Sequence, residues 1–250
     1  MAQFTCNCPS YTLGRELRFN VFLPEYVTGG DFKTVYLLHG LSDDCTSWFR
    51  RSSAERYARN HNAAIICPEA ECSFYTNTAA GDNFYDYVAK EVVEISRRMF
   101  RLSDKREDTF IAGLSMGGYG AYMIALKNPD VFSAAASLSG AVDICDIMCD
   151  RDDFSFFSRK IWGDDYKKTL PGSDGDIFAL VDKLEKSDMP KPRLFQLCGR
   201  SDFMLNGNRK FNEFMKDKSF EHCYYEVDGG HEWAVWDEAL PKVLDFFLGQ

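Results

Sequence analysis

The chain has 250 residues, 45% of them hydrophobic, and a formal net charge of −9 at neutral pH. This size and apolar content suffice for a single globular domain over residues 1–250 with one sizeable core. The negative charge argues against nucleic acid or an anionic membrane as the main partner, because both are themselves negatively charged.

Neither a membrane span nor an export signal is evident in the sequence. No apolar stretch approaches the length needed to cross a bilayer, and the first residues contain no basic segment leading into an apolar run. The nine cysteines are an odd, scattered set without the paired C-x-x-C spacing of zinc sites. We therefore expect reduced thiols, no metal site and a cytoplasmic location. The acidic residues between 143 and 153 favour a solvated face over a calcium site.

Taken in order, the chain alternates strands with helices. Residues 16–22 alternate apolar and polar side chains, which predicts a half-exposed antiparallel strand near an edge of the sheet. The short apolar run at 35–38 is typical of a parallel strand covered on both faces, 63–67 is another buried strand, and further strands are expected at 109–112, 134–138, 193–198 and 222–227. Helices are expected at 48–60, 84–99, 119–127, 211–215 and 233–247. This order predicts an α/β fold with a mostly parallel central sheet and helices on both faces.

The stretch from 141 to 191 interrupts the simple alternation. It contains acidic runs, a turn-rich segment at 171–175 and isolated aromatic residues. Two interpretations remain open: a small cap-like insertion that covers the site, or ordinary helical decoration of the sheet.

A G-x-S-x-G run at 113–117 lies between the apolar residues 109–112 and the helix expected from 119. That context is typical of a nucleophile elbow, in which the serine sits on a strained turn between a strand and a helix. Glycines two residues before and after the serine remove the Cβ atoms that would clash in so tight a turn. The pattern predicts Ser115 as a nucleophile.

A serine hydroxyl needs a base, and position in the sheet separates the four histidines. Ligands bind at the carboxyl ends of the strands in an open parallel sheet. His61 and His222 precede or open strands, so we expect both at the opposite edge. His39 ends a strand, but the neighbouring Gly40 and Leu41 indicate another role. His231 follows the last strand after a glycine loop, and we expect it to act as general base and then general acid.

The acid that orients the base should also follow a strand. Asp202 lies just past the strand expected at 193–198, and the order Ser, Asp, His is the one used by α/β-hydrolases. Asp228 and Glu226 are closer to His231 in sequence and are rivals for this role. The topology favours Asp202, which would hold the His231 tautomer and stabilise its cation.

Two backbone amides are candidates to stabilise an oxyanion. One is the N–H of Met116, directly after the nucleophile. The other is the N–H of Leu41, in the loop after an earlier strand, where Gly40 allows the backbone to turn its amides inward.

Several motifs together resemble the esterase D-like α/β-hydrolases, within them the bacterial tributyrin and cinnamoyl (feruloyl) esterases. These motifs are residues 39–43, 73–77, 113–121, 137–140 and 230–233. The resemblance implies an α/β-hydrolase fold and no cofactor. It implies a serine carboxylesterase that hydrolyses short-chain or aromatic esters, acetyl or feruloyl, through an acyl-enzyme. The family's catalytic positions fall on Ser115, Asp202 and His231, and its oxyanion positions on Leu41 and Met116.

The resemblance also bears on substrates and partners. Trp48, Tyr75 and Trp162 are candidates to line the acyl pocket, although such residues are more often part of the core than ligand contacts. We expect a small-molecule ester as substrate, with acylated oligosaccharides as a family-level expectation, and exposed aromatic residues would suit a homodimer. Two alternatives stay open: a thioesterase of the S-formylglutathione hydrolase type, and a non-catalytic binding protein on a hydrolase scaffold.

Overall fold

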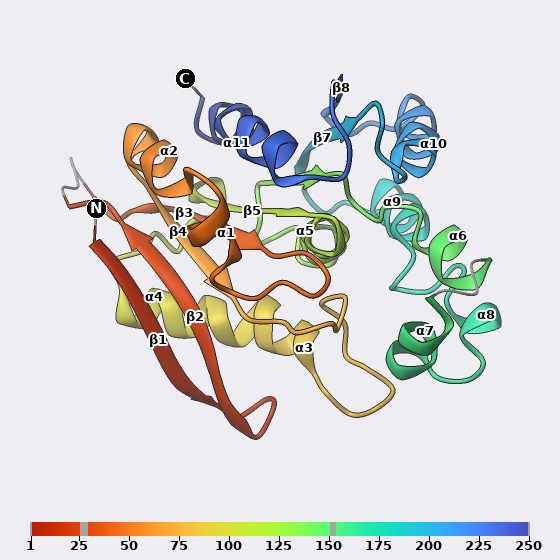
Figure 1. Cartoon of the computed structure of the whole chain (residues 1–250), viewed down its shortest axis with the longest axis horizontal. Helices are drawn as coiled ribbons and strands as arrows, with labels where there is room; N and C mark the ends of the chain where they lie inside the picture. The colour runs from red at the N-terminus through yellow and green to blue at the C-terminus, as the bar shows by residue number, and fades with distance from the viewer. Residues whose placement is uncertain (1, 26–29, 151–153, 250) are drawn as a thin grey trace.

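The computed structural model describes residues 2–25, 30–150 and 154–249, and one twisted sheet runs through them (Figure 1). Its strands are β1 (Ala2–Ser10), β2 (Arg15–Leu23), β3 (Lys33–Leu38), β4 (Ala63–Pro68), β5 (Thr109–Leu114), β6 (Ala134–Leu138), β7 (Arg193–Gly199) and β8 (His222–Val227). They lie in the order β1-β2-β4-β3-β5-β6-β7-β8. β2 pairs antiparallel with β1 and β4, and all the other pairs are parallel.

Helices connect most of the strands. Before the elbow they are α1 (Ser47–Arg51), α2 (Ala54–His61), α3 (Phe84–Asp86), the π-helix η1 (Tyr87–Glu91), α4 (Val92–Met99) and the 3₁₀ turn η2 (Arg106–Asp108). After it they are α5 (Met116–Lys127), α6 (Ile144–Cys149), α7 (Ser155–Trp162), α8 (Tyr166–Thr169), α9 (Ile177–Glu185), α10 (Leu205–Met215) and α11 (Trp233–Leu248). Among the described residues, no helix combines the length and apolar character that crossing a membrane requires.

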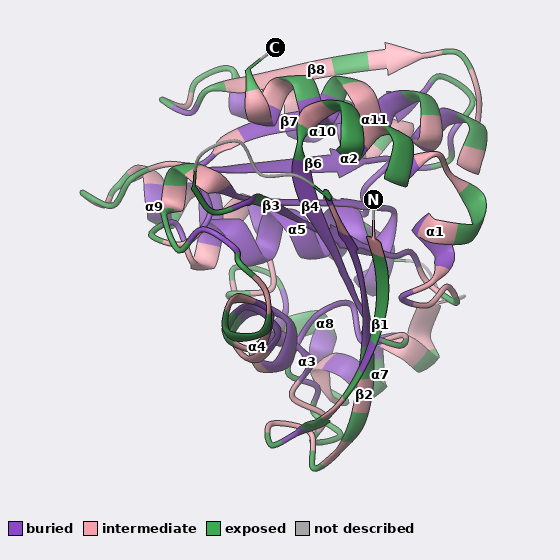
Figure 2. Cartoon of the chain, turned by 90° about the vertical axis from the view of Figure 1, so that its left-hand side faces the viewer, coloured by how far each residue is buried: buried purple, intermediate pink, exposed green. Residues whose placement is uncertain are grey.

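The side chains of the central strands alternate between two cores, one on each face of the sheet. Val35 and Leu37 of β3 pack with α1, α2 and α11, whereas Tyr36 and Leu38 pack on the other face with α4, α5, α9 and α10. Figure 2 shows the consequence: the central strands are buried along their length, and the outer strands β1 and β8 are largely half-buried or exposed. The expected α/β fold, with helices on both faces of a mostly parallel sheet, is confirmed.

Three local features differ from the sequence-based expectation. The strand near 16–22 is antiparallel as expected, but the edge strand is β1, which shows no clean alternation because only Cys6 and Ser10 of it are buried. The helix expected at 48–60 is two helices, since the backbone at Ser52 is extended (φ −135°, ψ 172°). The helix at 84–99 is continuous but widens into the π-helix η1.

The stretch 141–191 lies between β6 and β7 and, in its described parts, forms the helices α6 to α9. It packs beside α5 on the face away from α11 (Figure 1). The Tyr119 hydroxyl donates to the Gly175 carbonyl at 2.7 Å, and the Ala79 amide donates to the Ile161 carbonyl at 2.8 Å. In the acidic run, Asp143 accepts from the amide of Asp146 at the start of α6 and pairs with Lys210 at 2.6 Å. Asp152 and Asp153 lie outside the described residues.

Candidate active site

The junction of β5 and α5 is a strained turn that contains Ser115. This residue has φ 53° and ψ −118°, a backbone conformation that costs a non-glycine residue about 1–3 kcal/mol. Its amide donates to the Leu138 carbonyl of β6 at 2.9 Å, which fixes the turn to the neighbouring strand. A Cβ at Gly113 would lie 2.3 Å from the Gly117 carbonyl oxygen, and one at Gly117 would lie 2.5 Å from that of Leu38. Only glycine fits at either position.

The structure brings Ser115, His231 and Asp202 into one hydrogen-bonded chain. The Nε2 atom of His231 lies 2.9 Å from the Ser115 Oγ atom, and its Nδ1 atom lies 2.9 Å from Oδ2 and 3.0 Å from Oδ1 of Asp202. Each residue lies just past the carboxyl end of a strand: Ser115 after β5, Asp202 after β7 and His231 after β8. Nδ1–H donates to the carboxylate, so Nε2 is left as the acceptor of the serine proton.

The environment of Asp202 keeps its carboxyl group ionised. The side chain is fully buried, and Oδ1 also accepts from the Met204 amide at 2.8 Å. Burial by itself raises the pKa of Asp202, but the hydrogen bonds from His231 and the Met204 amide outweigh it and hold the pKa below its ordinary value. The ionised form is therefore the one that faces the imidazole.

The two rival acids have other partners. Glu226 accepts from Arg209 Nε at 2.7 Å, and the side chain of Asp228 is 96% exposed and pairs with Arg200 at 2.9 Å. Both carboxylates are thus engaged with arginines, whereas Asp202 is the carboxylate against His231.

The other three histidines have hydrogen-bond partners away from the Ser115 hydroxyl. His222 Nε2 faces Gln196 Oε1 at 3.1 Å, and His61 Nε2 faces Asp245 at 2.8 Å. His39 is buried, and its Nδ1 atom lies 2.8 Å from the Gly40 carbonyl oxygen. The exclusion of His61 and His222 by their place relative to the strands, and of His39 because of its neighbours Gly40 and Leu41, agrees with these contacts.

A pocket of about 340 Å³ opens beside the Ser115 hydroxyl. Its lining residues come from three segments: Gly40, Leu41 and Asp43 after β3; Leu114 and Ser115 at the end of β5; and His231, Glu232, Trp233 and Trp236 at the start of α11. Two leucines and two tryptophans give the walls their apolar part, and polar groups, two carboxylates among them, line nearly as much of the surface. This composition suits a small, uncharged ligand with an apolar part.

Two backbone amides close to the Ser115 hydroxyl have no acceptor among the described residues. Met116 is the first residue of α5, where helical amides lack an intrahelical partner. Leu41 lines the pocket, and the carbonyl of the preceding Gly40 accepts from the Asp43 amide at 3.2 Å. Both donors are therefore free to bind an oxygen of a ligand.

The three aromatic residues expected in the pocket are not among its lining residues. Trp48 is buried, and its Nε1 donates to the Leu38 carbonyl at 2.9 Å. Tyr75 is fully buried, and its hydroxyl donates to the His39 carbonyl at 2.9 Å. Trp162 packs against Phe74 with ring centroids 6.1 Å apart and lines a different pocket. Each side chain packs in or against the protein interior instead of facing the serine.

Two aromatic residues that the sequence reasoning missed contact the His231 ring. The ring of Phe203 lies 4.5 Å from it, centroid to centroid, and that of Trp236 lies 5.0 Å away, nearly perpendicular. Phe203 is 59% exposed, which is unusual for so large an apolar side chain. Its position directly after Asp202 is the signal that could have identified it.

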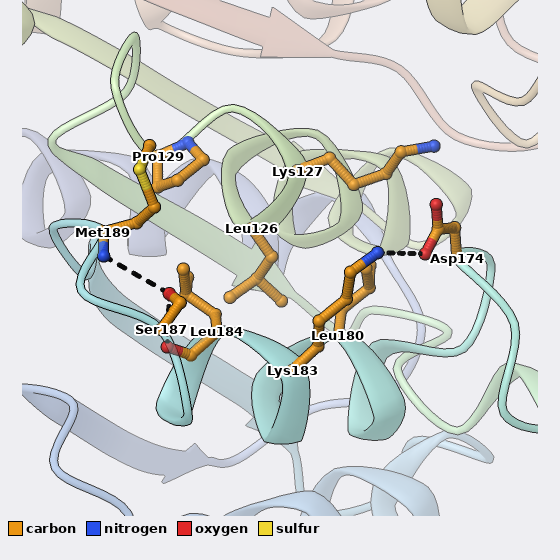
Figure 3. A pocket seen from close by; sticks show the side chains of 9 residues that line it. All are labelled: Leu126, Lys127, Pro129, Asp174, Leu180, Lys183, Leu184, Ser187 and Met189. Atoms are coloured by element: carbon orange, nitrogen blue, oxygen red, sulfur yellow. Dashed lines mark hydrogen bonds and ion pairs between the residues drawn. The ribbon is translucent and has the colours of Figure 1, made fainter.

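A second pocket, of about 270 Å³, lies between α5 and α9 (Figure 3). Leu126, Leu180 and Leu184 form its apolar part, and Lys183 pairs with Asp174 at 2.9 Å on its rim. No histidine is among the residues that line it, so this pocket lacks the acid–base group that a serine nucleophile needs.

Metal-ligand geometry is also lacking in the part of the chain that the structure describes. No group of three or more His, Cys, Asp or Glu side chains lies close enough there to hold an ion. All nine cysteines are free thiols.

Comparison with known proteins identifies the family. Residues 10–247 match the model of the family described as "Putative esterase". The acetyl esterase of Caldicellulosiruptor saccharolyticus is 34% identical over 227 residues, which are 88% of this chain and 85% of that protein.

Two solved structures from Staphylococcus aureus are also similar. FphF, a fluorophosphonate-binding serine hydrolase, is 35% identical with a TM-score of 0.92, over 100% of this chain and 99% of the other. An S-formylglutathione hydrolase is 34% identical with a TM-score of 0.89, over 99% of both chains. The chain therefore belongs to this esterase family, and it is a carboxylic ester hydrolase with the α/β-hydrolase fold.

Proposed function

We propose that the protein is a serine carboxylesterase that hydrolyses short-chain or aromatic acyl esters through an acyl-enzyme. The observation that carries the proposal is the Ser115–His231–Asp202 chain, whose hydrogen bonds are 2.9 to 3.0 Å long. A complete chain of nucleophile, base and orienting acid beside a pocket supports catalysis over a non-catalytic binding role.

In the first half of the reaction, Ser115 Oγ attacks the ester carbonyl carbon while its proton passes to His231 Nε2. The new oxyanion accepts hydrogen bonds from the Leu41 and Met116 amides. Asp202 stabilises the imidazolium that forms. The carbon–oxygen bond to the alcohol then breaks, His231 gives its proton to the departing alcohol oxygen, and the acyl group stays on Ser115.

The second half repeats this path with water. His231 takes a proton from water, the hydroxyl oxygen bonds to the acyl carbon, and the same two amides hold the oxyanion. The bond to Ser115 Oγ then breaks and the serine recovers its proton from His231, so the acid is released and the enzyme is regenerated.

The pocket supports short-chain and aromatic acyl groups as substrates. A volume of about 340 Å³ suits a small ester, and Trp233 and Trp236 offer faces for an aromatic acyl group such as feruloyl. The similar acetyl esterase supports acetyl as one acyl group. Asp43 and Glu232 can accept hydrogen bonds from hydroxyl groups, which supports an acylated oligosaccharide as the natural ester.

A second candidate function is hydrolysis of S-formylglutathione, favoured by the hydrolase of that thioester at 34% identity. The same serine could attack a thioester carbonyl. Relative kcat/KM values for S-formylglutathione, an acetyl ester and a feruloyl ester discriminate the two functions. We expect the oxygen esters to be preferred.

Replacement of the nucleophile tests the proposal. We expect Ser115→Ala to fold normally and to lose at least about 10⁴-fold in kcat/KM on p-nitrophenyl acetate. Ser201→Ala, in an exposed turn, is the matched control and should keep full activity. A fluorophosphonate should phosphonylate Ser115 Oγ with loss of fluoride, so its phosphonyl group should add mass to the parent protein only. Turnover by Ser115→Ala at the parent rate would refute the mechanism.

We further propose that residues 1–250 act as one domain in the cytoplasm, with 141–191 as helical decoration. The single sheet supports one domain, and the nine free thiols support a reducing compartment. Tyr225, 49% exposed on the last strand of the sheet, supports a homodimer through β8.

A further inference from the structure

A second buried histidine lies two residues from an amide that lines the Ser115 pocket. His39 is 1% exposed and follows β3 directly. Its Nδ1 atom lies 2.8 Å from the Gly40 carbonyl oxygen, and its Nε2 atom lies 3.1 Å from the Ala70 amide nitrogen and 3.4 Å from Glu69 Oε1. The mechanism described above gives this ring no part in the reaction.

The bond to Gly40 determines where the next amide points. A carbonyl oxygen only accepts hydrogen bonds, so Nδ1 carries a proton whatever the charge of the ring. The peptide between Gly40 and Leu41 is trans and planar, so its C=O and N–H point in opposite directions. Holding the carbonyl against the buried His39 ring therefore turns the Leu41 N–H away from that ring.

The His39 ring is itself held by a hydrogen-bonded network around Glu69. Glu69 accepts hydrogen bonds from the amides of Cys45 at 3.2 Å, Ala70 at 3.1 Å and Glu71 at 3.0 Å. Burial raises the pKa of Glu69, but its interaction with His39 and the hydrogen bonds from the Glu71 and Cys45 amides outweigh it and lower the pKa to about 2. The Tyr75 hydroxyl fixes the His39 carbonyl from another side.

We propose that His39 is a positioning residue for the oxyanion site: through its Nδ1–H bond to the Gly40 carbonyl, it aims the Leu41 amide at the substrate carbonyl oxygen. The ring is held in the orientation that this bond requires through Nε2, which accepts from the Ala70 amide when the ring is neutral and donates to Glu69 when the ring is a cation. The inference rests on the proposed esterase function, in which the Leu41 amide binds the oxyanion.

A purely structural role for His39 is the competing explanation, since the ring also fills buried space. The two roles differ in what they need from the ring. Positioning needs a donor at the Nδ1 position, because the Asp43 amide alone, at 3.2 Å, would be left on the Gly40 carbonyl. A packing role needs only the volume of the side chain, whichever of the two ring positions the substituting amide reaches.

Two substitutions separate these requirements. His39→Asn keeps an N–H donor near the Nδ1 position and loses the Nε2 contacts, whereas His39→Gln extends to the Nε2 position and loses the Nδ1 donor. We expect His39→Gln to lower kcat on p-nitrophenyl acetate by about 10- to 100-fold with little change in KM, because a transition-state donor is misaligned. We expect His39→Asn to stay within about threefold of the parent.

His61 provides a matched control. Its Nδ1 atom also faces a backbone carbonyl, that of Tyr57 at 2.7 Å, and its Nε2 atom faces the carboxylate of Asp245 at 2.8 Å. This pair of contacts lies between α2 and α11, away from the pocket. His61→Asn and His61→Gln should therefore change thermal stability without changing kcat.

A thionoester supplies a readout that loss of packing does not move. Its sulfur accepts hydrogen bonds weakly, so the parent protein should favour the oxygen ester over the matched thionoester. His39→Gln should reduce this preference by about the factor lost in kcat, and His39→Asn should keep it. Equal activities of the two His39 variants, or an unchanged preference in His39→Gln, would refute the positioning role. The proposed function fails separately, if Ser115→Ala keeps its activity.

Discussion

The assignment of Asp202 as the acid of the triad makes a sharp prediction for Asp202→Asn. The Met204 amide donates to Oδ1 at 2.8 Å, so the amide oxygen of an asparagine will occupy the Oδ1 position. Placing the NH₂ group there would set two donors against each other. The NH₂ group then takes the Oδ2 position, which lies 2.9 Å from His231 Nδ1.

That arrangement favours the other tautomer of the imidazole. The new N–H donor, 2.9 Å from Nδ1, opposes a proton on Nδ1, and the neutral amide oxygen, 3.0 Å away at the Oδ1 position, accepts that proton less strongly than a carboxylate does. The tautomer with the ring proton on Nε2 is therefore favoured. Nε2 then faces the Ser115 hydroxyl with a proton and cannot accept another. We expect kcat/KM to fall by about 10⁴-fold, which corresponds to about 5 kcal/mol of transition-state stabilisation. Stability should change by only about 1 kcal/mol, because the buried group becomes neutral and keeps its bond to Met204.

Initial rates on p-nitrophenyl acetate and thermal unfolding of both proteins measure these quantities. Asp228→Asn is the matched control, since Asp228 is 96% exposed and makes a surface ion pair with Arg200 that contributes little. It should retain the parent rate within about twofold. The reverse pattern, with Asp228→Asn inactive and Asp202→Asn active, would refute the tautomer argument and transfer the role to Asp228.

Two further predictions concern stability. Gly117→Ala would place a Cβ 2.5 Å from the Leu38 carbonyl oxygen, so we expect its urea midpoint to fall by the equivalent of about 1–3 kcal/mol. In Gly230→Ala the nearest atom would be 3.8 Å away, and an equal loss there would contradict this reasoning. Burial lowers the pKa of His222 to about 4, below the ordinary value of 6.5. Between about pH 4 and 6.5 the imidazole is therefore protonated in the unfolded chain but not in the folded protein. Stability should therefore fall as the pH drops from about 6.5 to 4, and His222→Gln should flatten that slope in urea titrations; an unchanged slope would contradict it.

The main features of the fold and of the triad were predictable because they follow from local patterns and one topological rule. Apolar runs marked the parallel strands, and the glycines around Ser115 marked a turn that only glycine allows. Since the carboxyl ends of parallel strands meet at one edge, Asp202 and His231 could be placed near Ser115 without coordinates. The edge strand β1 was not predicted, and its side chains show no periodic burial in the structure. The break between α1 and α2 at Ser52 was not predicted either, because no proline or glycine lies there.

Contacts between side chains from distant segments were decided only by the tertiary structure. The position after a strand favoured Asp202 in the sequence, but the turn of the loop after β8 that sends Asp228 to Arg200 was visible only in the structure. Trp48, Tyr75 and Trp162 are aromatic residues of the kind that line pockets, yet in the structure none of them lines the Ser115 pocket. The aromatic rings that pack against His231 are instead those of Phe203 and Trp236. The position of a strand follows from the pattern of residues within it. The neighbours of a side chain depend instead on how segments distant in the sequence pack around it.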